Sequence, residues 1–285
     1  MDVSGTHLQE FVSGIGFAEG LRWHRSALWA SDIVQRRVMR VDADGGVETV
    51  LSTPGEPSGL GWLPDGSLLV VQMDEHELWR WDGARFSRYC ATTPISRAKL
   101  NDLAVDGHGR AWVSNLGFDY ETENPRPTAL VGVDHDRRVA VAAEDLWCPN
   151  GLAISPAGDR LYVGQSASSE VLEFDITAAG ELAGRRLFGR LPEAAFSDGI
   201  CLDSEEALWI ASPTTREFLR MERGGRISHR VSTGDRHAIA CVLGGRDRRT
   251  LYCATSGTLS LARARQACLG RIEAIEVDVP GAGFP

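Results

Sequence analysis

The sequence predicts an all-β protein, a six-bladed β-propeller that occupies residues 1–285 as a single domain. Three observations support this prediction. A strand–turn–strand unit occurs six times, its copies begin at intervals of about 39–49 residues, and no amphipathic helix of three turns is visible. Four short strands at such a period are typical of propeller blades, whose radial packing protects most sheet edges. A pair of β-sandwiches shares the strand spacing but does not explain the period.

The clearest copy of the unit is residues 148–163, Cys-Pro-Asn-Gly-Leu-Ala-Ile-Ser-Pro-Ala-Gly-Asp-Arg-Leu-Tyr-Val. Two apolar runs, 152–154 and 161–163, flank a Ser-Pro-Ala-Gly-Asp turn, which predicts a β-hairpin. Asn150 stands just ahead of the first strand. Its amide can therefore present a carbonyl oxygen at one end of the sheet.

The other five copies follow the same order. The residues that lead the six first strands are Glu19, Ser58, Asn101, Asn150, Asp198 and Ala238. The second strands are predicted at 28–30, 68–70, 111–113, 161–163, 208–210 and 251–253. An aromatic or bulky apolar residue recurs in each second strand, which indicates a common packing position.

Third and fourth strands complete the units. The third strands are predicted at 38–41, 78–81, 131–133, 171–174, 218–221 and 272–275. Apolar and polar residues alternate in them with a period of two, which indicates one buried face. Fourth strands are predicted at 47–51, 86–90, 138–141 and 227–231. The sixth unit lacks a fourth strand, whereas an unassigned strand stands near residues 7–12. We expect this N-terminal strand to close the ring, and residues 259–269 to form an insertion within the last blade.

The composition excludes several classes of partner. The chain has 30 basic and 39 acidic residues, a formal net charge of −9, and no block of Lys or Arg, so nucleic acid and anionic membranes are not expected partners. No leader-like segment and no apolar run of membrane-spanning length is visible, which favours a soluble cytoplasmic protein. The six cysteines lack Cys-x-x-Cys spacing and are expected to be free thiols. The oligomeric state stays open.

The lead residues carry the candidate chemistry. In a propeller the innermost strands lie side by side, so their starting residues meet at one mouth of the central channel. Two carboxylates, Glu19 and Asp198, and two amides, Asn101 and Asn150, occupy these positions, with no Lys or Arg among them. Asn and Asp are also ordinary turn residues, but four at one repeat phase favour a site. Oxygen-only ligands suit a hard divalent cation, Ca²⁺ or Mg²⁺.

Five segments resemble one known family. Residues 17–23, 99–102, 109–112, 148–152 and 196–200 are similar to motifs of the gluconolactonase, regucalcin and luciferin-regenerating-enzyme family of six-bladed propellers. The resemblance implies that Glu19, Asn150 and Asp198 hold one divalent metal ion, Ca²⁺ first, with Zn²⁺, Mg²⁺, Mn²⁺ or Fe²⁺ as alternatives. It implies further that Asn101 reaches the metal or the substrate, and that Asp198 is also the catalytic base.

Two departures from the family pattern bear on the substrate. Lys99 stands where the family usually has an arginine, so a planar two-pronged donor is replaced by a point charge. Residues 115–121 depart from the family's usual Gly-Thr-Met. Lys99, Asn101 and Glu121 are the predicted substrate contacts.

A metal-dependent lactonase is the function that these residues predict. Opening a lactone needs a polarised carbonyl, a water nucleophile and a stabilised oxyanion, and one dication can supply the first and third. A small sugar-type lactone is the expected substrate. Two alternatives stay open, a hydrolase of aryl or phosphorus esters on the same fold and a non-catalytic calcium-binding propeller. No Gly-x-Ser-x-Gly, His-Glu-x-x-His or phosphate-binding loop is present.

Overall fold

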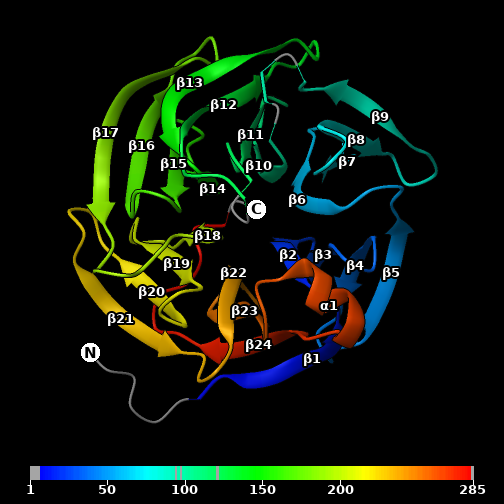
Figure 1. Ribbon diagram of the computed structural model, residues 1–285, viewed down its shortest axis with the longest axis vertical. Coiled ribbons are helices and arrows are strands. Elements are labelled where there is room, and N and C mark those ends of the chain that lie inside the picture. Colours follow the sequence, from blue (N-terminus) through cyan, green and yellow to red (C-terminus); the bar gives the residue numbers. More distant parts are fainter. Residues whose placement is uncertain (1–6, 94, 97, 120–121, 284–285) are drawn as a thin grey trace.

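Six four-stranded antiparallel sheets form a closed ring in the computed structural model, which describes residues 7–93, 95–96, 98–119 and 122–283 (Figure 1). The described residues form 24 strands and one helix. The first strand of each blade lies at the centre of the ring and the fourth at its periphery (Figure 1). The structure confirms the predicted six-bladed β-propeller.

The blades follow one another along the chain. The first holds β2 (Ala18–His24), β3 (Ala27–Asp32), β4 (Arg37–Val41) and β5 (Val47–Ser52), and the second holds β6 (Pro57–Trp62), β7 (Leu68–Gln72), β8 (Glu77–Trp81) and β9 (Phe86–Ala91). The third holds β10 (Leu100–Val105), β11 (Ala111–Asn115), β12 (Pro127–Val133) and β13 (Val139–Trp147), and the fourth holds β14 (Pro149–Ile154), β15 (Arg160–Gln165), β16 (Glu170–Ile176) and β17 (Leu182–Arg190). The fifth holds β18 (Ile200–Leu202), β19 (Leu208–Ser212), β20 (Glu217–Met221) and β21 (Ile227–Ser232), and the sixth holds β22 (His237–Gly244), β23 (Thr250–Ser256), β24 (Gly270–Glu276) and β1 (Gln9–Ile15).

The N-terminal strand closes the ring, as predicted. β1 pairs antiparallel with β24, and the register matches Gln9 with Ala274 and Ile15 with Gly270. The strand begins two residues later and ends three residues later than the predicted range 7–12. Because the chain runs from β1 in the sixth blade directly into β2 in the first, this pairing ties the last blade to the first (Figure 1).

Packing between blades uses the strands that were predicted from apolar runs. All five residues of β7 and of β19 are buried, and the largest core cluster joins side chains of blades 1, 2, 3 and 6. Such interdigitated apolar faces supply most of the stabilisation of an all-β ring. The six cysteines, which all lie in the described part of the chain, are free.

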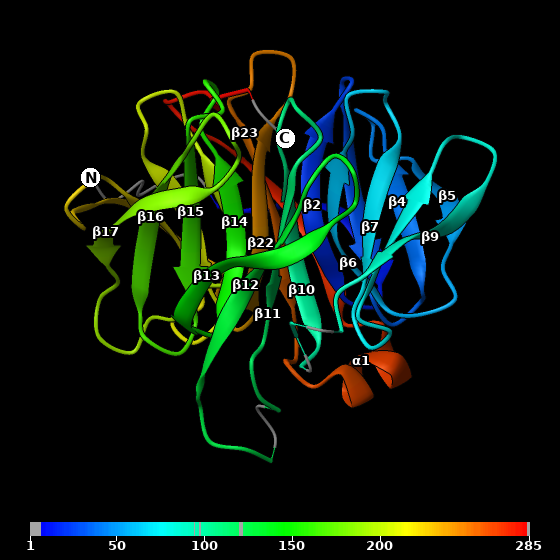
Figure 2. The ribbon, with the colours of Figure 1, turned by 90° about the horizontal axis from the view of Figure 1, so that it is seen from above.

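The two faces of the ring differ. Helix α1 (Leu261–Ala267), which is the predicted insertion between β23 and β24, and the β11–β12 loop extend from one face (Figure 2). The C-terminal segment crosses the other face, where Gly281 N–H donates to the Arg248 carbonyl and Ala282 N–H to that of Leu202. Ser260 caps the helix, its hydroxyl accepting from Arg263 N–H. In the part of the chain that the structure describes, no helix has the length and apolarity needed to span a membrane.

Candidate functional site

A cavity of about 390 Å³ opens among the starts of the inner strands, and its lining includes Leu261 of α1. Its lining includes five of the six predicted site residues: Glu19, Lys99, Asn101, Asn150 and Asp198. The structure therefore brings together residues that are separated by up to 179 positions in the sequence. The sixth, Glu121, lies outside the described residues.

Glycines after two of the lead residues allow the inner strands to approach closely. A Cβ added to Gly151 would lie 2.5 Å from the Asp198 carbonyl oxygen, and one added to Gly199 would lie 2.7 Å from the Cα of Ala240. Gly151 N–H donates to the Asp198 carbonyl at 3.2 Å, which links blades 4 and 5. This contact brings Asn150 of β14 close to Asp198, which precedes β18, at the mouth.

Glu19 is a buried carboxylate on β2, with 9% of its surface exposed. Its Oε2 accepts from Gly20 N–H at 3.1 Å. Burial raises the pKa of the Glu19 carboxyl well above its ordinary value, and the charges of Asp198 and Asp102 raise it further. A group in this environment gains from a nearby cation, because positive charge offsets both the desolvation and the repulsion.

Asp198 lies two residues before β18, where it is half-buried and lines the cavity. Burial raises the pKa of its carboxyl to about 8, and the charge of Asp102 adds to the effect, whereas hydrogen bonds from Asn150 and Gly199 lower it. Among the described residues, neither Asp198 nor Glu19 forms an ion pair with a basic side chain. Both carboxylates thus lack a direct basic partner in this cavity, although the charge of Arg22 acts on Glu19 from a distance.

Serine residues hold the side-chain amides of Asn150 and Asn101, the first by its NH₂ group and the second by its carbonyl oxygen. Asn150 Nδ2 donates to Ser166 Oγ at 3.2 Å, and Ser166 in turn donates to the Ser197 carbonyl. The Asn150 carbonyl oxygen is therefore the part suited to be a ligand. Asn101 Oδ1 instead accepts from Ser58 Oγ at 3.2 Å, so its NH₂ group is the part suited to donate to a substrate.

Asp102 and Arg22 form a buried ion pair beside these residues, which the sequence analysis did not predict. Arg22 NH2 donates to Asp102 Oδ1 at 2.7 Å and to the Leu103 carbonyl at 2.6 Å. Asp102 Oδ2 accepts from Leu152 N–H at 2.9 Å, a contact from blade 3 to blade 4. The pair holds Asp102 in place and joins the inner strands β2, β10 and β14.

Lys99 lies at the edge of the cavity and also lines a neighbouring cavity of about 530 Å³. Its Nζ lies 3.2 Å from a Glu56 carboxylate oxygen and 3.0 Å from an Asp74 oxygen. Burial lowers the pKa of the Lys99 ammonium, but Asp74 and Glu56 outweigh burial and leave that pKa raised. Lys99 is thus a charged residue that already has two anionic partners, and its predicted contact with substrate stays a prediction.

The walls of the cavity are apolar, which sequence reasoning missed. Several of these side chains belong to loops and to α1, outside the repeat phases that the sequence makes visible. Phe196 and Leu259 are 44% and 39% exposed and stand among the few large exposed apolar residues of the described chain. The apolar lining consists of Phe17, Ile33, Met73, Leu116, Phe118, Pro125, Phe196, Leu259 and Leu261, together with Pro213 and Ala167.

The donor set fits a hard divalent cation. Glu19 and Asp198 supply anionic oxygen and Asn150 a neutral one, a combination that Ca²⁺ accepts. The Cys148 thiol also lines the cavity, but burial raises its pKa to about 11, so it stays protonated and is a poor ligand. Within the described ranges, no three or more His, Cys, Asp and Glu side chains gather as a metal site. The predicted set has only two such residues, and an amide supplies the third ligand.

A family model described as the SMP-30/Gluconolactonase/LRE-like region matches residues 17–257 of the chain. The chain belongs to this family. It is similar to the 6-deoxy-6-sulfogluconolactonase of Pseudomonas putida, at 26% identity over 90% of this chain and 89% of that protein.

Solved structures of the same fold include a luciferin-regenerating enzyme, with a TM-score of 0.82 at 19% identity over 97% of each chain. Another is a calcium-binding protein, regucalcin, from Agrobacterium tumefaciens, with a TM-score of 0.79 at 18% identity over 100% of this chain and 97% of that one. Family members named as lactonases support a lactone hydrolase.

Proposed function

We propose that this protein is a metal-dependent lactonase that opens a small sugar-type lactone, with one divalent cation held by Glu19, Asn150 and Asp198. The observation that carries the proposal is the pair of uncompensated carboxylates, Glu19 and Asp198, that line one cavity with an oriented amide. The lactonase names of relatives with 26–27% identity support the reaction class.

Lactone hydrolysis adds one water molecule across an ester bond. The water oxygen bonds to the carbonyl carbon, the bond from that carbon to the ring oxygen breaks, and the ring oxygen takes up a proton, which yields a hydroxy acid. A bound dication supplies polarisation of the carbonyl and stabilisation of the oxyanion. Side chains of the cavity must carry out the remaining steps of the reaction.

Asp198 is the proposed base. It lines the cavity floor and in its ionised form can accept the proton of the attacking water and then return it to the leaving ring oxygen. Asn101, whose carbonyl accepts from Ser58, has its NH₂ group available to donate to the substrate. Glu19 is buried and contributes the second negative charge of the ligand set.

Ca²⁺ is the proposed ion. The ligand set is all oxygen, which suits Ca²⁺, whereas Zn²⁺ sites usually contain His or Cys. The similar regucalcin from Agrobacterium tumefaciens is named a calcium-binding protein, which supports the choice. Mg²⁺, Mn²⁺, Zn²⁺ and Fe²⁺ are the alternatives, and each can be added separately to chelator-treated protein.

One observation favours the second candidate, hydrolysis of another ester class such as aryl esters. The walls above the polar floor are apolar, with three phenylalanines, Phe17, Phe118 and Phe196, among them. Such walls suit an ester that carries an apolar group better than one that carries hydroxyls.

The test is hydrolysis of five- and six-membered sugar lactones, followed by proton release, before and after removal of metal. We expect turnover that is lost on chelation and restored by Ca²⁺. If the protein binds Ca²⁺ but hydrolyses no lactone and no aryl ester with any of the five ions, it is a non-catalytic calcium-binding propeller instead.

A further inference from the structure

The candidate site has two chemically distinct parts. Its floor holds the polar set of Glu19, Asn101, Asn150 and Asp198. Its walls are formed by aromatic and aliphatic side chains that come from blades 1, 2 and 3, from the segment before β18 and from the segment around α1. These wall residues are Phe17, Ile33, Met73, Leu116, Phe118, Phe196, Leu259 and Leu261.

The polar side chains at the edge of the cavity already have partners in the protein. Ser166 Oγ donates to the Ser197 carbonyl at 2.6 Å and accepts from Asn150. Thr214 Oγ1 donates to the Ala194 carbonyl at 2.5 Å. These contacts leave few hydrogen-bonding atoms on the walls for a bound molecule.

Lys99 is engaged in the same way. Its ammonium group lies within 3.2 Å of carboxylate oxygens of both Glu56 and Asp74. Glu56 is itself nearly fully buried, with 4% of its surface exposed, and also pairs with Arg265. Drawing Lys99 toward a substrate hydroxyl would weaken its contact with the buried Glu56 carboxylate, which is unfavourable.

This arrangement disfavours a heavily hydroxylated ring. A sugar lactone carries hydroxyls on most of its ring carbons, and each hydroxyl that leaves water needs a hydrogen-bonding partner. The floor groups are required for the cation and for the ester group. Hydroxyls directed at the walls would face Phe118, Phe196, Leu259 or Leu261 instead.

We propose that the preferred substrate is a lactone whose ring carries an apolar alkyl or aryl substituent, which packs against Phe118, Phe196, Leu259 and Leu261. This inference rests on the proposed lactonase function and ranks lactones with an apolar substituent above sugar-type lactones as its substrates. The ester group sits on the polar floor, and the substituent points outward along the walls. The exposed rim residues Phe196 and Leu259 become covered when the substituent binds.

The experiment is a series of five-membered lactones with unbranched alkyl chains of increasing length on the ring carbon next to the ring oxygen. Sugar lactones of the same ring size, and one phenyl-substituted lactone, complete the panel. We expect kcat/KM of the metal-loaded protein to rise about fourfold per added methylene, until the chain outgrows the cavity. We expect the sugar lactones to fall below the short-chain alkyl members.

A matched pair of variants locates the effect. Leu259→Ser removes an apolar side chain from the rim, whereas Leu187→Ser makes the same change on the outer strand β17, where Leu187 is 49% exposed. We expect Leu259→Ser to lower kcat/KM for the longest-chain lactone about tenfold or more and to flatten the dependence on chain length. Leu187→Ser should leave the dependence of kcat/KM on chain length as it is in the parent protein.

Binding of lactams, which keep the ring and chain but resist hydrolysis, separates the two proposals. If lactam affinity rises with chain length while no lactone is opened, the lactonase function fails but the apolar walls bind as inferred. If lactones are opened but neither kcat/KM nor lactam affinity depends on chain length, the inference is overturned while the lactonase function stands. Tighter binding and faster turnover of sugar lactones would also overturn it.

Discussion

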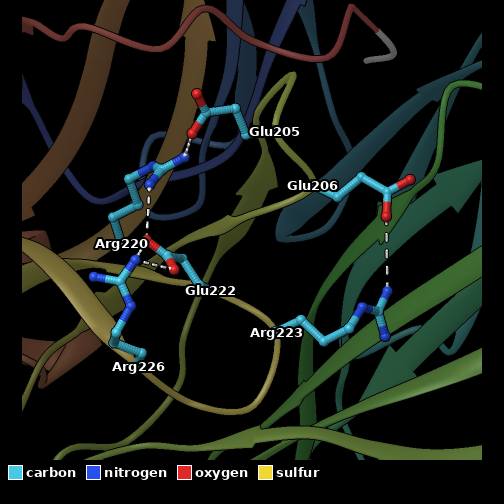
Figure 3. Close-up of a pocket in the computed structure, with 6 residues that line it drawn as sticks. All are labelled: Glu205, Glu206, Arg220, Glu222, Arg223 and Arg226. Carbon is cyan, nitrogen blue, oxygen red and sulfur yellow. Dashed lines mark hydrogen bonds and ion pairs between the residues drawn. The ribbon is translucent and has the colours of Figure 1, made fainter.

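Two cavities of similar volume, about 390 Å³ each, differ in whether their carboxylates have basic partners. In the first, glutamates lie beside arginines, as Figure 3 shows. Arg220 lies 2.8 Å from Glu205, Arg223 lies 3.8 Å from Glu206, and Arg226 pairs with Glu222. In the second, at the mouth, Glu19 and Asp198 have no such basic partner among the described residues.

The difference indicates which cavity needs a ligand. Paired charges on the surface balance one another and contribute little to stability. Buried carboxylates without a counter-ion are unfavourable for folding and are kept where function requires them. We therefore expect the ligand at the mouth and not in the charged cavity, whose residues Glu205 and Glu206 lie beyond the other end of β18 from Asp198.

The largest effect is expected when the mouth loses its proposed base. Asp198→Asn keeps an oxygen ligand but removes the group that accepts the water proton. Hydrolysis should fall by about 10²–10⁴-fold, the usual range for general-base catalysis, while calorimetry still detects the cation. Parent-level turnover of this variant under saturating cation would show that another group is the base.

Charge removal from the ligand set should weaken cation binding most. Glu19→Gln removes one of two anionic ligands, so we expect Ca²⁺ affinity to fall by about 100-fold or more, beyond the roughly 10–100-fold that loss of an outer-shell partner causes. In chelator, the same variant should be more stable than the parent, because a buried uncompensated charge is gone. Calorimetry measures the first effect and thermal unfolding the second.

Glu205→Gln is the matched control in the charged cavity. The Glu205 side chain is 65% exposed, and Arg220 keeps its contact with Asp203 when Glu205 is replaced. We expect Ca²⁺ affinity and turnover to be unchanged and stability to change by no more than about 1 kcal/mol. If Glu205→Gln weakens Ca²⁺ as much as Glu19→Gln does, the two cavities do not differ as described.

A smaller effect is expected from the residue that orients an amide. Ser166→Ala removes the acceptor that holds the Asn150 NH₂ group, so the Asn150 carbonyl is no longer fixed for the cation. Ca²⁺ affinity should fall by about 10-fold, at the low end for outer-shell partners. Unchanged affinity by calorimetry would mean that Ser166 does not position the ligand.

Proton release should accompany cation binding. Without the cation, the pKa of Asp198 is raised from 3.8 to about 8, so near pH 7 this carboxyl is largely protonated, and binding must release the proton. The native state then holds more protons than the unfolded chain between about pH 4 and 8, so the cation-free protein should lose stability as pH rises through this window. Calorimetry in buffers of different ionisation enthalpy checks the release. No release at pH 7 would contradict the assignment.

The repeat made the fold and the polar floor predictable. Equivalent positions in a propeller are neighbours, so the phase shared by Glu19, Asn101, Asn150 and Asp198 was sufficient to place them around one mouth. The strand β17 (Leu182–Arg190) was not predicted, because its run is interrupted by Gly184 and by arginines. The end of β1 was placed three residues early for a similar reason, since Gly14 interrupts that strand.

The walls and the supporting contacts were not predictable from the repeat. Phe118, Leu259 and Leu261 belong to insertions that have no counterpart in other blades, so no pattern relates them to the mouth. The partners of Lys99 come from Glu56 and Asp74, which only the packing of neighbouring blades reveals. The orientation of each amide depends on a serine from another strand, a long-range contact that the sequence does not show.

The most direct test of the cation site is a crystal structure of the protein grown with Ca²⁺, with anomalous diffraction used to locate the ion. We expect one strong peak at the mouth, about 2.3–2.6 Å from oxygens of Glu19, Asn150 and Asp198. A map without a peak at the mouth, or with its only peak in the cavity of Glu205 and Glu222, would contradict it.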